Sequence, residues 1–222
     1  MSDPGRVKGR TAGRLGGGAA RYALAASALL LCAPDERVRA QLQASGRASG
    51  CSLAALRQSF YDRFCIPQSG LYIPPYEHVF QRRKRIGGCW HFPPARFDGA
   101  SAVEAIYGRF GFRHRELDAE PILRAPHLPG DHLGFMLAFV GWVLEGVERR
   151  AATPIEVVAH LQGFITNHLD EWVEAYGDLL QRSEPDGYSA AVGEAVCEAM
   201  EEARKAVAES TQGRCAARLP AS

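Results

Sequence analysis

Apolar residues recur at steps of three and four through most of this chain, which is the periodicity of helices that bury one face. No segment alternates between apolar and polar residues for long enough to predict a strand. Proline- and glycine-rich stretches separate the periodic runs. The pattern predicts an all-α fold, a single-domain globular helical bundle with long Pro/Gly-rich connections. The predicted helices cover about residues 19–32, 34–45, 52–66, 101–110, 131–148, 154–182 and 189–210.

One stretch organises the chain, Leu128–Phe139, in which the turn Pro129-Gly130 runs directly into a predicted helix start at Asp131. Asp131 is expected at the N-cap, where its carboxylate can accept a backbone N–H bond. From the sequence, no such structural role is expected for His132. An adjacent carboxylate and imidazole at a helix start can instead face a ligand at the lip of a groove, so both interpretations of Asp131 stay open here.

Capping signals mark the ends of three other predicted helices. Ser52 is a suitable N-cap for the helix that Pro67 stops. Ser101–Glu104 has the spacing of a capping box, and Gly111 follows that helix as a C-terminal glycine should. Thr153–Glu156 is a second capping box, with proline at the favoured first position of a long helix.

Between these helices lie connections that prolines hold out of helical geometry. Residues 66–75 are expected to be extended and to lead into a short helical turn, Tyr76–Phe80. The basic run Arg82–Arg85 is expected to be a solvated face rather than a nucleic-acid site, because the net charge of the whole chain is only +1. Residues 86–99 and 112–130 are expected to be irregular.

The composition fits one soluble domain, with 222 residues of which 46% are hydrophobic and 23% charged. The six cysteines are scattered without a C-x-x-C pair, so neither a zinc site nor a disulfide framework is indicated. We predict a disordered basic tail over residues 1–18, an all-helical domain over 19–211 and a frayed C-terminal tail over 212–222.

An uncharged run from Tyr22 to Pro34 follows several arginines and resembles a secretory signal. Its end at Leu31-Cys32 even resembles a lipoprotein cleavage site, although leucine fits poorly where a small residue is wanted. The alternative is a buried first helix with a stripe of apolar side chains, and we prefer this prediction. The run is too short to span a membrane, so no stable membrane insertion is expected.

Sequence motifs for common enzyme chemistry are absent, since there is no Walker loop, G-x-G-x-x-G, H-E-x-x-H or G-x-S-x-G. His114, His127 and His132 could gather with Asp131 as a metal-assisted hydrolase site, but no regular ligand spacing supports this alternative. Proline-marked extended segments beside Asp131 and His132 are more typical of a groove for a peptide. We therefore expect no catalytic residues, no bound metal and no cofactor.

Three motifs in order resemble the TorD/DmsD family of redox-enzyme maturation chaperones, to which the NarJ-type chaperones are related. Ile73–Phe80 resembles the family's Pro-aromatic-Glu-Ser-Val-aromatic segment, with His78 where serine is usual. Pro129–Phe139 resembles its Pro-x-Asp-His signature and the helix that follows. Phe164–Leu179 resembles its late Phe-x-x-x-His-Leu-x-x-Trp helix, and the likeness spans roughly residues 20–210.

This resemblance implies a cytoplasmic, all-helical chaperone rather than an enzyme. Such proteins bind the N-terminal twin-arginine signal peptide, or a related N-terminal segment, of a molybdopterin-dependent oxidoreductase. They hold that enzyme back from export until its cofactor is inserted. Nucleic acid is not an expected partner, and a monomer or a domain-swapped dimer would both suit such a chain. No phosphate-binding loop supports the guanine-nucleotide binding that has been associated with the family.

The resemblance also implies which residues contact the peptide. Asp131 is the first candidate for a ligand-facing carboxylate that pairs with the arginines, and Glu77 is the second. Pro129 and His132 would shape the lip of an apolar groove. The peptide track would be lined by Tyr76, Val79 and Gly111, the last because a Gly-Phe pair often follows the family's aromatic helix.

Overall fold

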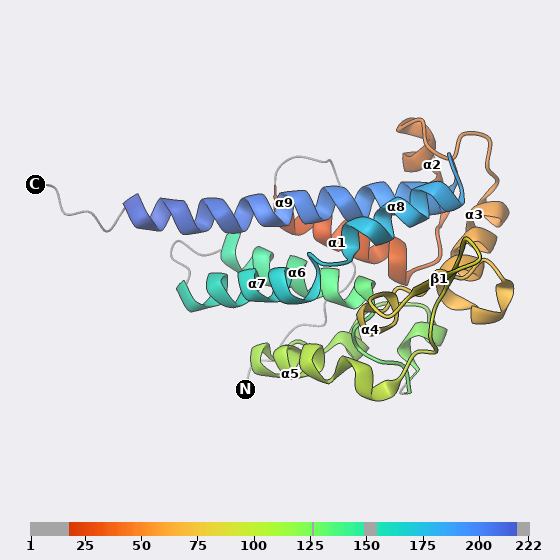
Figure 1. Ribbon diagram of the computed structural model, residues 1–222. Helices are drawn as coiled ribbons and strands as arrows, with labels where there is room; N and C mark the ends of the chain where they lie inside the picture. The colour runs from red at the N-terminus through yellow and green to blue at the C-terminus, as the bar shows by residue number, and fades with distance from the viewer. Residues whose placement is uncertain (1–17, 126, 149–154, 217–222) are drawn as a thin grey trace, which may run out of the picture.

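Helix α9 (Tyr188–Ala216) runs along the molecule, and α1 (Ala19–Leu31), α6 (Leu133–Glu148) and α8 (Val173–Ser183) pack beside it (Figure 1). This computed structural model describes residues 18–125, 127–148 and 155–216. Further helices are α2 (Glu36–Ala44), α3 (Leu53–Phe60), α4 (Glu77–Phe80), α5 (Ser101–Phe110) and α7 (Ile155–His168). A π-helical turn (Tyr61–Cys65) prolongs α3, and short 3-10 turns occupy Pro67–Ser69, Phe97–Ala100, His114–Glu116 and Pro121–Arg124. The predicted all-α class is confirmed.

Small residues let the central helices approach one another closely. Helix α1 is buried between α6 and α9, and Leu30 is fully enclosed there. A Cβ atom on Gly141 of α6 would come within 3.1 Å of the Ala20 carbonyl oxygen of α1. A Cβ atom on Gly193 of α9 would lie 2.6 Å from the Gly177 carbonyl oxygen of α8. These glycines therefore fix the helix spacing, and the uncharged N-terminal run is a core helix, as we preferred from the sequence.

Two of the predicted helix ends are confirmed in detail. The Ser52 hydroxyl accepts a hydrogen bond from the Ala55 amide at 3.1 Å, so Ser52 caps α3. Gly111 ends α5 in the left-handed conformation, with φ of 70°, which a residue with a side chain rarely adopts. The end of α9 differs, because this helix continues to Ala216, beyond the end near residue 210 that the apolar stripe indicated.

The capping box predicted at Ser101–Glu104 is wrong. Ser101 lies inside α5, and its hydroxyl donates to the Asp98 carbonyl oxygen at 2.9 Å. The Glu104 carboxylate instead accepts from the backbone amide of Gly130 at 3.1 Å, so a tertiary contact has replaced the local one. The second predicted box, at Thr153, lies outside the described residues.

The single long helix predicted over 154–182 is two helices, α7 and α8, separated by a turn at residues 169–172. Leu169 and Trp172 are both buried within this turn. The Trp172 indole donates to the His168 carbonyl oxygen at 2.7 Å and so satisfies a group left free at the end of α7. Apolar spacing alone could not reveal this break, because both helices keep the same helical stripe.

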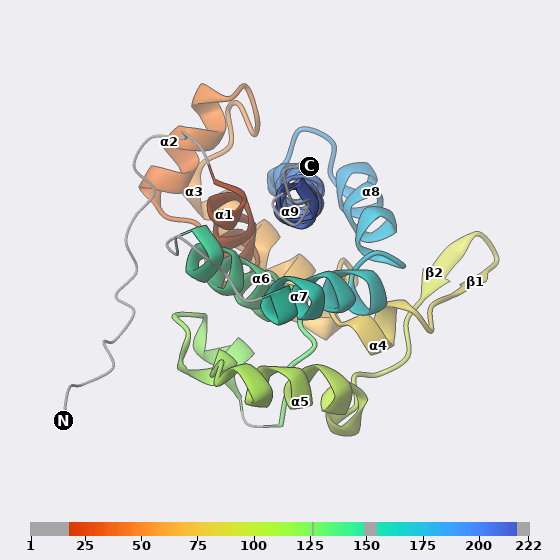
Figure 2. The same ribbon diagram turned by 90° about the vertical axis from the view of Figure 1, so that its left-hand side faces the viewer.

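A small hairpin was also missed by the sequence analysis. Strands β1 (Lys84–Ile86) and β2 (Cys89–His91) pair antiparallel through a two-residue turn at Gly87-Gly88, where both glycines have positive φ. The hairpin projects away from the helices (Figure 2). Its strands are too short to show an alternating pattern. None of the described helices is long and apolar enough to cross a membrane.

Candidate functional site

Two motifs that are far apart in the sequence form one structural unit. Tyr76 and His132 pair in an isolated antiparallel bridge, and their rings meet edge to face at 5.2 Å. The Leu133 amide donates to the Pro75 carbonyl oxygen at 2.7 Å, and the Glu77 amide donates to the Asp131 carbonyl oxygen at 3.2 Å. The proline-rich segment is therefore fastened to the start of α6 by backbone bonds on both sides of the bridge.

Asp131 caps a different helix from the one predicted. Its Oδ2 atom accepts from the His78 backbone amide at 2.9 Å, at the start of α4, and lies 2.6 Å from His78 Nδ1. Helix α6 begins at Leu133 rather than Asp131, and the residue that caps it is His132, whose Nδ1 accepts from the Gly134 amide at 3.0 Å. The prediction of Asp131 as the N-cap of α6 is therefore wrong.

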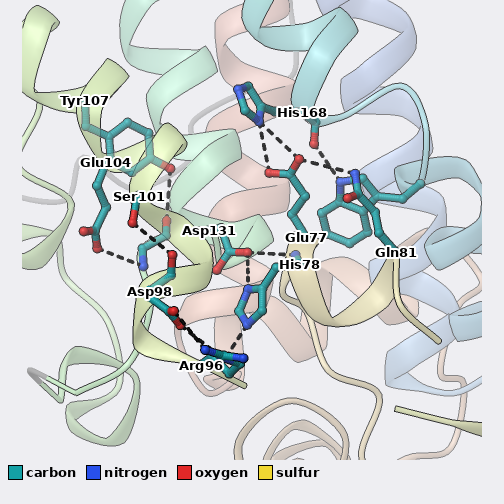
Figure 3. A network of polar contacts seen from close by, with 12 residues as sticks. Glu77, His78, Gln81, Arg96, Asp98, Ser101, Glu104, Tyr107, Asp131 and His168 are labelled. Carbon is teal, nitrogen blue, oxygen red and sulfur yellow. Dashed lines mark hydrogen bonds and ion pairs between the residues drawn. The ribbon is translucent and has the colours of Figure 1, made fainter. Parts of the chain in front are cut away.

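His78 joins three segments of the chain. Its Nε2 atom accepts from the Arg96 backbone amide at 3.0 Å, so the proton of the neutral ring is on Nδ1 and is donated to Asp131 (Figure 3). The ring is buried, and a Cβ atom on Gly99 would lie 2.5 Å from it. In the sequence, His78 differed from the motif of the resembled family, in which serine is usual at this position. No local signal indicated that it would tie α4 to the loop before α5.

The two histidines beside Phe135 are neutral at pH 7. Burial lowers the pKa of His132 to about 3. Burial, with a smaller effect of the Arg115 charge, lowers the pKa of His114 to about 4. Both rings contact Phe135, with centroid distances of 5.5 Å for His132 and 5.2 Å for His114. The Nε2 atoms of both histidines are enclosed and have no hydrogen-bond partner among the described residues.

Glu77 is committed to an ion pair with α7. Its carboxylate lies 3.1 Å from His168 Nδ1, and both side chains are largely buried. The Gln81 amide also donates to it at 3.3 Å (Figure 3). The contact fastens α4 to the end of α7, so the second candidate for a ligand-facing carboxylate has a partner within the chain.

An apolar cavity of about 640 Å³ opens next to this unit. Residues of segments 64–79, 90–95 and 122–128 supply its walls, and we call it the apolar cavity below. Trp90 and the aromatic and proline residues that follow it form one wall, although their sequence predicted only an irregular connection. An aromatic residue next to a Pro-Pro pair was the available signal for this wall.

The structure separates the seven predicted peptide contacts into two sets. Tyr76 and Val79 line the apolar cavity. The other five lie outside its lining: Asp131, His132 and Pro129 are buried behind it, Glu77 pairs with His168, and Gly111 ends α5. Burial raises the pKa of the Tyr76 phenol, so its hydroxyl is neutral at the wall.

The alternative of a metal-assisted site required His114, His127 and His132 to lie close together, and they do not. Within the described part of the chain, no three His, Cys, Asp or Glu side chains are placed to hold a metal ion. His127 lines the apolar cavity, whereas His114 and His132 lie against Phe135. The arrangement offers an apolar surface with a polar support, and the described residues bring no set of three metal ligands together there.

Comparison with known proteins agrees with this arrangement. The sequence profile of the nitrate reductase delta subunit family matches residues 31–176, which include both paired motifs and all of the residues that line the cavity. No curated protein and no solved structure matches the chain. The resemblance to TorD/DmsD and NarJ-type chaperones is consistent with the profile match. The chain belongs to the nitrate reductase delta subunit family, a family of maturation chaperones for molybdoenzymes.

Proposed function

We propose that this chaperone binds an N-terminal segment of a molybdopterin-dependent oxidoreductase, either a twin-arginine signal peptide or another segment. It acts in the cytoplasm and assists maturation and cofactor insertion before export. The observation that carries the proposal is the apolar cavity, whose wall includes Tyr76 and Val79. An apolar groove of this kind is the complement of an apolar stretch in a peptide.

Exposed hydrophobic side chains at the cavity support this proposal. Trp90 is 42% exposed and Ile122 is 47% exposed, and both line the cavity. Leu71, which is 50% exposed, lies between the lining residues Gly70 and Tyr72. Large apolar side chains that are exposed together at one opening are typical of a binding surface. Single exposed apolar side chains are common elsewhere on proteins and need no such explanation.

The buried polar unit would give this groove its rigidity. The Asp131 carboxylate is hydrogen-bonded to the His78 ring. That ring accepts a hydrogen bond from the Arg96 amide, which is next to the wall residue Ala95. His132 is bridged to Tyr76, which is itself a wall residue. In this proposal Tyr76 and Val79 contact the peptide, whereas Asp131 and His132 position the walls.

The size of the cavity is adequate for moderate affinity. Each 100 Å² of apolar surface that a bound peptide buries there would contribute about 2.5 kcal/mol, at about 25 cal/mol per Å². Ordering a flexible peptide and losing its free motion offset a large part of that gain. A dissociation constant in the micromolar range is therefore expected.

The test is calorimetry with the full chain and N-terminal peptides of a molybdoenzyme catalytic subunit from the same genome. Trp90→Ala and Ile122→Ala should each weaken binding about tenfold, since each removes apolar contact at the opening. Trp142→Ala and Ile155→Ala are matched controls, because these residues are 40% and 49% exposed and lie outside the cavity lining. Equal loss in the control variants, or no binding to any such peptide, would contradict the proposal.

A further inference from the structure

The lining of the apolar cavity carries no carboxylate. Among its described residues there is no aspartate, glutamate, lysine or arginine, and the basic groups that line it are His91 and His127. The nearest charges therefore lie at the edge of the cavity rather than in its floor. The sign of these charges determines which charged residues of a bound peptide can lie next to its apolar segment.

One edge is a basic hairpin, residues 82–91, whose run Arg82–Arg85 holds four cations. The guanidinium carbons of Arg83 and Arg85 lie 5.2 Å and 5.7 Å from the ring centroid of Trp90, a residue of the cavity wall. These two side chains donate to the carbonyl oxygens of Phe80 and Gly88. In the part of the chain that the structure describes, no carboxylate pairs with any of the four cations.

Two further arginines lie near the wall that residues 122–128 form. Arg124 is exposed and lies between the lining residues Leu123 and Ala125. The Arg115 guanidinium donates to the carbonyl oxygens of Ala125 and Leu128 at 3.3 Å and 3.2 Å and lies 3.7 Å from the Glu104 carboxylate, so it fastens this wall and is paired within the chain. The hairpin therefore supplies the guanidinium groups that contact the cavity wall.

Four carboxylates near the cavity are engaged within the chain. Asp131 is bound to His78, and Glu77 is paired with His168. Glu120 accepts from the Tyr61 hydroxyl at 3.0 Å and from the Ala33 amide at 3.2 Å. Asp98 neutralises Arg96 through two bonds. None of these groups is placed to receive a pair of arginines at the edge of the cavity.

From this distribution of charge we infer that the segment held in the apolar cavity carries carboxylates directly beside its apolar stretch, and that an arginine pair does not dock at this edge. The inference rests on the proposed function. Guanidinium groups at an apolar surface attract carboxylates and repel other guanidinium groups. Where a signal peptide carries twin arginines, they lie away from this edge when its apolar stretch is bound.

Three synthetic peptides test the inference about charge separately from the proposed peptide binding. They share one apolar core of leucine and alanine with a fluorescent label, and the core is followed by two glutamates, two serines or two arginines. With the full chain, the glutamate peptide should bind about tenfold more tightly than the arginine peptide, with the serine peptide between them. Raising the salt concentration should reduce this difference, because it screens exposed charges.

Variants locate the effect on the hairpin. Arg83→Gln/Arg85→Gln should bring the glutamate and serine peptides to equal affinity, while binding of the apolar core itself is retained. Arg109→Gln/Lys205→Gln is the matched control, since it removes two exposed cations from α5 and α9, outside the cavity lining. It should leave the order of the three peptides unchanged.

The outcomes are distinguishable. If all three peptides bind equally, or the arginine peptide binds best, the inference about charge is overturned while the proposed function stands. If none binds, both fail. Tighter binding of a labelled oligonucleotide than of the glutamate peptide, or peptide binding blocked by self-association of the chain, would assign this edge to another partner and overturn the inference.

Discussion

The Asp131 carboxylate and the His78 imidazole lie 2.6 Å apart, although 53 positions separate them in the sequence. The same carboxylate accepts the backbone amide of His78, so one side chain caps α4 and orients the ring that follows. Through the Arg96 amide that ring also reaches the segment beside the cavity wall. One buried aspartate therefore organises three segments around the apolar cavity.

Removing this carboxylate should destabilise the fold. Asp131→Ala is expected to lower the free energy of unfolding by about 2–4 kcal/mol, because it leaves two buried donors without an acceptor. Asp131→Asn should cost about 1 kcal/mol, since the amide oxygen can still accept the backbone N–H. Urea denaturation at pH 7 measures both. Asp98→Asn is the control, because Asp98 is exposed, and equal effects of the alanine and control variants would contradict the role given to Asp131.

Replacing His78 by serine should loosen the loop that supplies one wall. The shorter side chain cannot reach the Arg96 amide, which His78 Nε2 accepts at 3.0 Å. In His78→Ser the hydrogen exchange of the Arg96 amide should therefore be faster by about tenfold or more. The Gly99 amide, which donates to the Arg96 carbonyl oxygen, reports on the rest of the turn. Unchanged protection at Arg96 would show that another contact holds this loop.

Acid should weaken the fold through the buried histidines. The pKa of His132 is lowered to about 3 and that of His114 to about 4, so the unfolded chain takes up these protons first. Their contribution is complete above about pH 6.5, and is lost as the pH falls, by about 1.4 kcal/mol per pH unit for each group. The contribution of each histidine stops falling once the pH is below the pKa of that histidine in the folded state.

This pH dependence can be assigned by substitution. His132→Asn keeps an acceptor for the Gly134 amide but takes up no proton, so its unfolding free energy should change less between pH 6.5 and pH 5. Gln162→Asn replaces an exposed residue that takes up no proton and should leave the slope unchanged. The same slope in the His132 variant as in the wild type would refute the assignment.

Glu77 offers a test of its predicted role as a ligand-facing carboxylate. Its ion pair with His168 should give a coupling of about 1 kcal/mol in a double-mutant cycle with Glu77→Gln and His168→Gln. Peptide affinity should change by less than about twofold in Glu77→Gln, because the carboxylate is engaged within the chain. A tenfold loss of affinity would mean that it leaves His168 to bind the ligand, as the family resemblance implied.

The close approach of α8 and α9 predicts opposite effects for two glycine substitutions. Gly193→Ala should lower the free energy of unfolding by about 2–3 kcal/mol, because its Cβ would meet the Gly177 carbonyl oxygen. Gly108→Ala lies in α5 with open space around the new Cβ, and should be neutral or stabilising by up to about 1 kcal/mol. Thermal unfolding of both variants is sufficient, and a neutral Gly193→Ala would disprove the tight packing.

Local features of the fold could be predicted because their causes are local. The stripe of apolar residues predicted the buried helices, Ser52 predicted its own cap, and Gly111 predicted the left-handed end of α5. The break between α7 and α8 could not be predicted, since burial of Leu169 and Trp172 causes it without changing the stripe. The hairpin was too short for an alternating pattern.

For the site, the sequence by itself determined the residue types and motifs: an aspartate beside a histidine after a Pro-Gly turn, and a proline-framed Tyr-Glu-His segment. Tertiary structure decided what each does. The backbone bridge between Tyr76 and His132 turns the Asp131 carboxylate inward to α4 and leaves Tyr76 at the cavity wall. Which way a side chain faces depends on the segment paired beside it, and that pairing joins residues that are distant in the sequence.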